Sequence, residues 1–63
     1  MNVIELLREK VSICQQRHHR AIDANTRMAG AVAADEADRL LLEVIEAKLE
    51  LARELQKQSA TAA

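Results

Sequence analysis

The 63-residue chain contains no phenylalanine, tyrosine, tryptophan or proline, and it has one glycine and one cysteine. The single cysteine, Cys14, excludes an internal disulfide and a zinc site built from several cysteines. One glycine is too few for a glycine-rich phosphate-binding loop. What is present is rich in Leu, Ala, Glu, Lys, Arg and Gln, which lose little side-chain freedom in a helix. The composition therefore predicts an all-α protein.

The length of the chain limits it to a single domain with a small core. A folded chain of this size buries roughly 60% of the surface that its unfolded form exposes, so a lone monomer is marginally stable. Small domains compensate with disulfides, a structural metal or association. With one cysteine, association is the remaining route, and we expect a homo-oligomer.

The charges are nearly balanced overall but unevenly distributed. The net charge is −1, so no global field directs the chain to nucleic acid or anionic lipid. Residues 1–28 carry five basic against three acidic side chains, a surplus of two positive charges, and residues 35–58 carry seven acidic against four basic, a deficit of three. The two halves are therefore expected to attract each other.

The N-terminal stretch MNVIELLREK lacks the basic start and the continuous apolar core of a secretory signal. No apolar run approaches the roughly 20 residues that a membrane span needs. We therefore expect a cytoplasmic chain with no membrane segment.

Apolar or small residues in the first half recur at alternating spacings of three and four. This heptad spacing is typical of a helix that packs along a seam, and it predicts a helix over residues 2–28. Other apolar residues widen this face, so the helix needs more than one neighbour. The seam comprises Ile4, Leu7, Val11, Cys14, His18, Ala21, Asn25 and Met28.

The segment 35–58 repeats the pattern and predicts a second helix, followed by a tail over 59–63 that has no periodic apolar residue and is expected to fray. Charged side chains fill the opposite face, which we interpret as solvated surface. The seam of this helix is Ala37, Leu41, Val44, Lys48, Leu51 and Leu55. Across both helices the predicted oligomer core is Leu7, Val11, Cys14, Ala21, Leu41, Val44, Leu51 and Leu55.

A turn is predicted over residues 29–34. Gly30 suits the left-handed position after a helix, and Asp35 with Glu36 places negative charge at the start of the next helix. A single continuous helix is the alternative, because one glycine in Ala-rich sequence costs only about 1 kcal/mol of helix propensity.

An antiparallel hairpin with this turn aligns Cys14 with Lys48, and His18 with Val44. Each hairpin would still expose an apolar flank on both helices. Pairing two hairpins hides these flanks, so the predicted assembly is a dimeric four-helix bundle.

Three polar residues lie on the predicted seams: His18, Asn25 and Lys48. A polar residue at such a position selects one register and one oligomeric state, which is our first interpretation of His18 and Asn25. Lys48 fits a side chain whose stem is buried and whose amine reaches water. The alternative is a polar pocket between helices, in which these residues bind an anionic or nucleotide-like ligand.

No enzyme chemistry is indicated by the sequence. Cys14 fits a small buried side chain, and no other residue is spaced to activate it except His18, one turn away. No Glu-x-x-His pair is present to complete a carboxylate metal site. We therefore expect no catalytic residue, no metal and no cofactor.

The favoured function is a small regulatory or adaptor module that binds its own copy and, in the cell, another protein. Nucleic-acid binding is the alternative, through Arg20 and Arg27, seven residues apart on the exposed side of the first helix. In length, helical pattern and the run ADEAD near the second helix, the chain resembles the plasmid repressor-of-primer family. That resemblance implies a dimer of helical hairpins that binds paired RNA loops. Against it, the net charge is −1 and no aromatic side chain is available to stack on a base.

Overall fold

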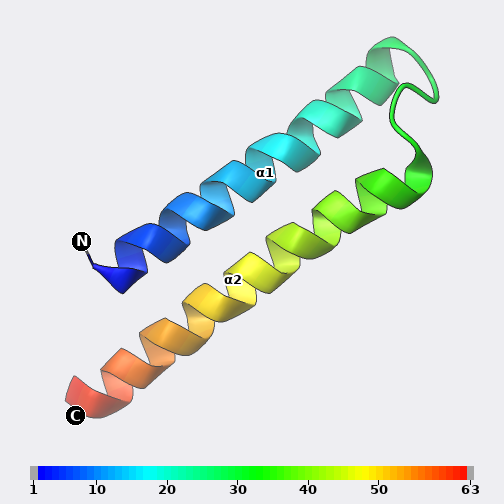
Figure 1. Ribbon diagram of the computed structural model, residues 1–63. Helices are drawn as coiled ribbons and strands as arrows, with labels where there is room; N and C mark the ends of the chain where they lie inside the picture. Colours follow the sequence, from blue (N-terminus) through cyan, green and yellow to red (C-terminus); the bar gives the residue numbers. More distant parts are fainter. Residues whose placement is uncertain (1, 63) are drawn as a thin grey trace.

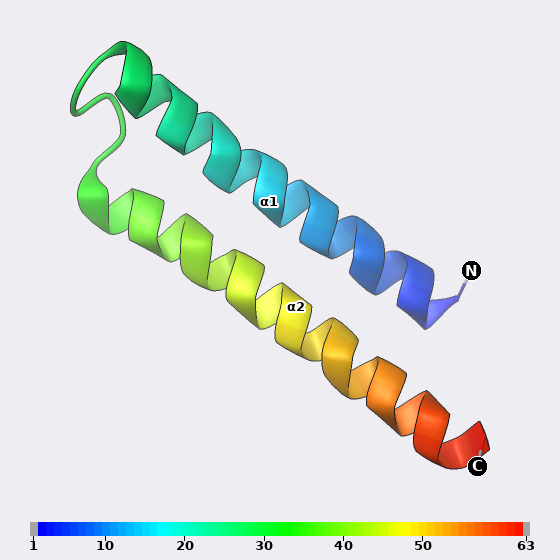
Figure 2. The same ribbon diagram turned by 180° about the vertical axis from the view of Figure 1, so that it is seen from behind.

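The computed structural model describes residues 2–62, and the side chains of residues 2–60. Two α-helices, α1 (Val3–Arg27) and α2 (Ala34–Ala62), run antiparallel and pack side by side. The connecting turn lies at one end of the molecule and both chain ends lie at the other (Figures 1 and 2). The predicted all-α hairpin is confirmed, and the alternative of one continuous helix is wrong. Within the described residues, neither helix combines the length and the apolar character of a membrane span.

Helix α1 begins at a well-defined N-cap. Asn2 has extended backbone angles, and its Oδ1 accepts a hydrogen bond from the Ile4 N–H at 2.9 Å. This bond satisfies one of the amide groups that have no partner inside the helix. Glu5 in the first turn and Arg27 in the last turn place charges that complement the helix dipole.

The turn depends on one glycine and one asparagine. Met28 leaves the helix with extended backbone angles, and Gly30 follows with φ of +80°, in the left-handed region that favours glycine. Asn25 Oδ1 accepts a hydrogen bond from the Val32 N–H at 2.8 Å, which joins the last turn of α1 to the loop. The turn is therefore held by a hydrogen bond from its own backbone to a side chain of α1.

Replacing Asn25 with alanine is expected to lower the free energy of unfolding by about 1 kcal/mol, because the partly buried Val32 N–H loses its acceptor. Thr26→Ala is the control, since the Thr26 hydroxyl bonds only to Ile22 O within α1. The control should change stability by less than about 0.5 kcal/mol. Urea titration of both variants measures the difference, and equal losses would contradict the role of Asn25 in the turn.

Helix α2 begins at Ala34 and continues to Ala62, four residues past the predicted end at 58. Nothing in the intervening sequence, Ser59 to Ala62, breaks a helix, since it contains neither proline nor glycine. Residue 63, the last of the tail that was expected to fray, lies outside the described residues.

The core of the hairpin is small. Among the side chains that the structure describes, five apolar residues are buried, namely Ile4, Cys14, Ala21, Val44 and Ala47. Cys14, Val44 and Ala47 form one cluster, with Val11 packed against it. Ala47 is the most buried residue, at 1% exposure, and its small side chain lets the two helices approach closely there.

The predicted alignment of Cys14 with Lys48 is wrong. Cys14 packs with Val44 and Ala47, whereas Lys48 is exposed. Helix α2 is rotated from the predicted orientation, so that Leu40, Val44, Ala47 and Leu51 form its buried or half-buried face. The spacings of four, three and four along this contact face match one side of a helix.

The residues predicted for the oligomer core therefore fall into three groups. Cys14, Ala21 and Val44 are buried between α1 and α2, and Leu7, Val11 and Leu51 are half-buried. Leu41 and Leu55 are each 42% exposed in the hairpin. Their place in an oligomer core stays a prediction.

Candidate functional site

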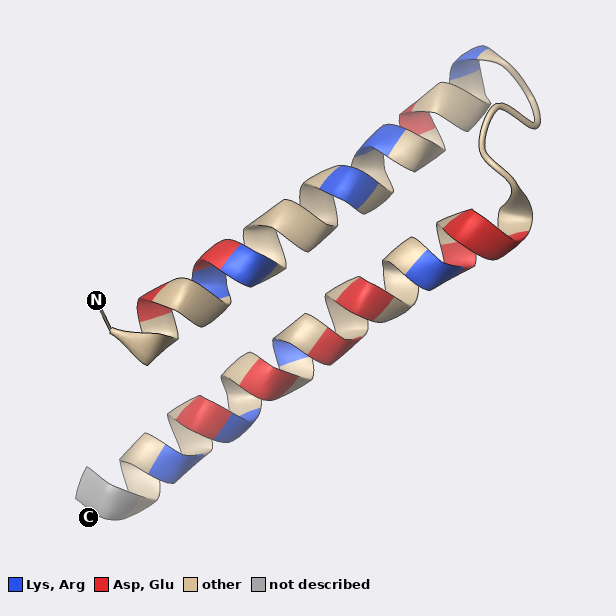
Figure 3. Cartoon of the chain, viewed as in Figure 1, with Lys and Arg blue, Asp and Glu red and all other residues tan. Residues whose placement is uncertain are grey.

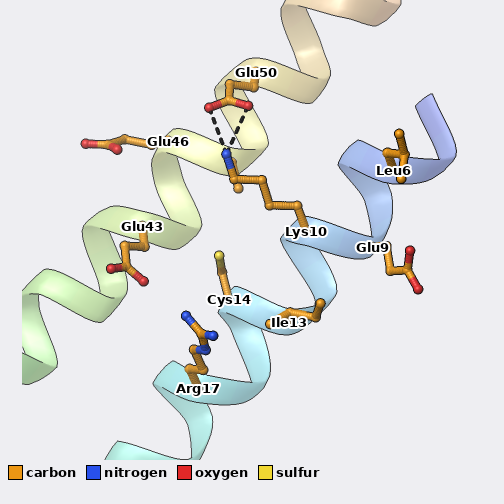
Figure 4. A pocket seen from close by; sticks show the side chains of 10 residues that line it. Leu6, Glu9, Lys10, Ile13, Cys14, Arg17, Glu43, Glu46 and Glu50 are labelled. Atoms are coloured by element: carbon orange, nitrogen blue, oxygen red, sulfur yellow. Dashed lines mark hydrogen bonds and ion pairs between the residues drawn. The ribbon is translucent and has the colours of Figure 1, made fainter. Parts of the chain in front are cut away.

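A groove of about 480 Å³ runs between the two helices on one face of the hairpin. We call it the charged groove. Its lining combines the buried Cys14 and Ala47 with charged and aliphatic side chains, most of which are labelled in Figure 4. The lining residues are Leu6, Glu9, Lys10, Ile13, Cys14, Arg17, Glu43, Glu46, Ala47 and Glu50.

One ion pair crosses the charged groove. Lys10 Nζ lies 3.1 Å from Glu50 Oε1 and 3.2 Å from Oε2, and donates hydrogen bonds to both oxygens (Figure 4). The two side chains are about half exposed, at 52% and 47%. Water and salt screen such a pair, so its contribution to stability is a fraction of 1 kcal/mol. Its main value is that it defines how the two helices align.

Opposite charges recur along the charged groove in the same alignment. Arg17 lies seven residues after Lys10, and Glu43 lies seven residues before Glu50, so the two residues occupy the next matching level of the antiparallel pair. Basic residues are prominent on α1 and acidic residues recur along α2 (Figure 3). Basic side chains of α1 therefore face acidic side chains of α2 in this groove, in keeping with the opposite net charges of the two halves of the sequence.

The sequence did not single out Lys10 and Glu50. The signal that would have found them is their opposite charge at positions that face each other across the two antiparallel helices. Which positions face each other depends on the alignment of the helices, and the alignment predicted from the sequence was wrong.

The three predicted ligand-binding residues are not gathered within one hairpin. Asn25 uses its Oδ1 in the turn, His18 is half-buried, and Lys48 is exposed. The Lys10–Glu50 pair shows which positions of the two helices lie at the same level. In this alignment Asn25 is level with residue 35 of α2, which is 13 residues, or about 20 Å at 1.5 Å per residue, from Lys48 along the hairpin axis. His18 and Lys48 are six residues apart on the same scale, or about 9 Å.

The two arginines of the nucleic-acid alternative are exposed on α1. Arg27 Nη2 lies 3.1 Å from Asp23 Oδ2, in an ion pair within the helix. This acidic neighbour reduces the positive field that Arg27 would offer to a phosphate group. In the part of the chain that the structure describes, no three His, Cys, Asp or Glu side chains are grouped so as to hold a metal ion.

Comparison of the chain with protein-family models, with curated proteins and with solved structures finds no match.

Proposed function

We propose that this chain is a non-enzymatic interaction module that works as a homodimer, in which two hairpins pack into a four-helix bundle. The observation that carries the proposal is the amount of surface that one hairpin leaves exposed. The chain exposes 5002 Å², whereas a compact monomer of 7.0 kDa exposes about 4,000 Å². The excess is about 1,000 Å², and a stable dimer of standard size buries about 800 Å² on each partner.

Large apolar side chains are numerous on the exposed surface of the hairpin. Ten large apolar side chains are between 42% and 67% exposed, against the five apolar residues that are buried. They are Val3, Leu6, Ile13, Ile22, Met28, Leu41, Leu42, Ile45, Leu49 and Leu55. Covering part of this surface with a second copy would supply the hydrophobic stabilisation that the hairpin core lacks.

The role that fits such a molecule is that of a regulatory or adaptor protein, which acts through its contact surfaces. Nucleic-acid binding and a pocket for an anionic ligand gain no specific support. Arg27 is paired with Asp23, and Asn25 is engaged in the turn. Neither alternative is therefore proposed.

A homodimer is expected to melt at a temperature that rises with protein concentration, because folding and association are one process. With an unfolding enthalpy of about 0.7 kcal/mol per residue, a 100-fold increase in concentration should raise Tm by roughly 10 °C. Thermal unfolding followed by circular dichroism measures this shift. A Tm that does not change across that range would contradict the proposal.

A further inference from the structure

Five of the exposed aliphatic side chains lie on one stripe of α2. Leu41, Ile45 and Leu49 follow one another at intervals of four residues and form one row, and Leu42 lies beside this row. Leu55 comes 14 residues after Leu41, close to four full turns, and so returns to the same side of the helix. We call these five residues the α2 stripe. It lies roughly 130° around the helix from the face that contacts α1.

The exposed aliphatic side chains of α1 have different surroundings. Leu6 and Ile13 line the charged groove, where Lys10 and Arg17 alternate with them and glutamates of α2 face them. Burying this face against another protein would remove water from the Lys10–Glu50 pair and from the other carboxylates that line the groove. The α2 stripe surrounds a single charged residue, Lys48, whose long stem lets its amine reach water.

We propose that two copies of this chain meet through α2, stripe against stripe, and that the charged groove stays in contact with solvent. This inference rests on the proposed homodimer and adds which surface forms it: the two α2 helices lie at the centre of the four helices, and the α1 helix of each hairpin lies on the outside. A second copy suits the stripe because a nearly uncharged surface can face itself without an array of like charges. The surface that one hairpin leaves in excess, about 1,000 Å², also matches what a stable dimer buries on each partner.

An antiparallel, two-fold symmetric contact gives the stripe its greatest overlap with itself. The stripe extends over 14 residues from Leu41 to Leu55, or about 21 Å. Its midpoint is residue 48, so the two-fold axis would pass close to Lys48 and the same residue of the second copy. The two amines at this point would both have to extend to water, which limits how tightly the copies associate.

The chain supplies two pairs of sites matched in residue type and exposure. Ile45 and Ile13 are 45% and 47% exposed, and Leu49 and Leu6 are 49% and 48% exposed. Ile45→Lys and Leu49→Lys are expected to raise the dimer dissociation constant by on the order of 100-fold, since each places a charge inside the contact. Ile13→Lys and Leu6→Lys are expected to raise it less than about 5-fold. Sedimentation velocity over a concentration series measures all four.

Equal or larger effects at Ile13 and Leu6 would contradict the assignment of the dimer contact to the α2 stripe, but not the homodimer itself. An unsubstituted chain that sediments as a monomer would instead overturn the proposed function itself.

Cross-linking keeps the inference testable if the lysine variants of the stripe fail to fold. In a Cys14→Ala background, Lys48→Cys should be joined rapidly into a covalent dimer by a short bismaleimide, because the two thiols lie beside the two-fold axis. Glu9→Cys, on the charged groove, is the control and should stay largely monomeric. Failure of Lys48→Cys to cross-link faster than Glu9→Cys would contradict the stripe-to-stripe contact.

Discussion

Val44→Asp is expected to abolish the helical fold at concentrations at which the unsubstituted chain is folded. Val44 is 6% exposed and packs in the cluster with Cys14 and Ala47, so the new carboxylate would be buried among apolar groups. An uncompensated buried charge costs about 3–5 kcal/mol. Domains have roughly 5–15 kcal/mol of total stability, and a chain with so small a core belongs at the low end. Far-UV circular dichroism measures the loss of helix.

Glu46→Asp is the matched control for this variant. It places the same side chain two residues further along α2, at an exposed position on the charged groove. Its effect should stay within about 0.5 kcal/mol. A folded Val44→Asp protein with unchanged helicity would show that α2 does not pack on α1 through the contact face described above.

Cys14 should react with thiol reagents on the order of 100-fold more slowly in the native protein than in urea. Cys14 is 7% exposed and packs against α2, so a bulky reagent reacts with it chiefly when the helices move apart. Each 1.4 kcal/mol of opening free energy slows labelling tenfold, so 100-fold protection corresponds to about 3 kcal/mol. Labelling with a chromogenic disulfide reagent gives both rates.

The neighbouring position provides the control for the labelling experiment. In a Cys14→Ser background, Ile13→Cys places the thiol at a site that is 47% exposed. That thiol should react at nearly the same rate with and without urea. Rapid native labelling of Cys14 itself would mean that the hairpin core is open in solution.

The two helices and the turn were predictable because the signals for them are local. The heptad spacing over residues 2–28 and 35–58, with Gly30 between them, identifies both helices and the reversal. The far end of α2 was placed too early because the criterion used was apolar periodicity. Residues 59–62 contain no proline or glycine, so nothing in their sequence ends the helix.

The alignment of the helices was not predictable, because α2 has apolar residues around most of its circumference. Either the line through Leu41, Lys48 and Leu55 or the line through Leu40, Ala47 and Leu51 could face α1. The structure places the second line inside, where the small Ala47 allows close approach and Lys48 keeps its charge in water. Both lines repeat at helical spacing, so periodicity alone does not separate them, and the charge of Lys48 was the signal that favours the second.

Asn25 shows why seam position alone did not define a role. Its position in the heptad pattern predicts a polar residue on the helix seam. In the structure its amide oxygen accepts a hydrogen bond from the Val32 N–H of the turn. Asparagine readily forms such local bonds to backbone, and its position five residues before Gly30 was the available signal.

The central claim is that the folded unit is a pair of hairpins, and the native mass tests it most directly. Sedimentation equilibrium at micromolar concentration should give twice the 7.0 kDa of one chain, or about 14 kDa, together with a helical circular-dichroism spectrum. A well-folded helical species with a mass of 7.0 kDa at every concentration would contradict the claim.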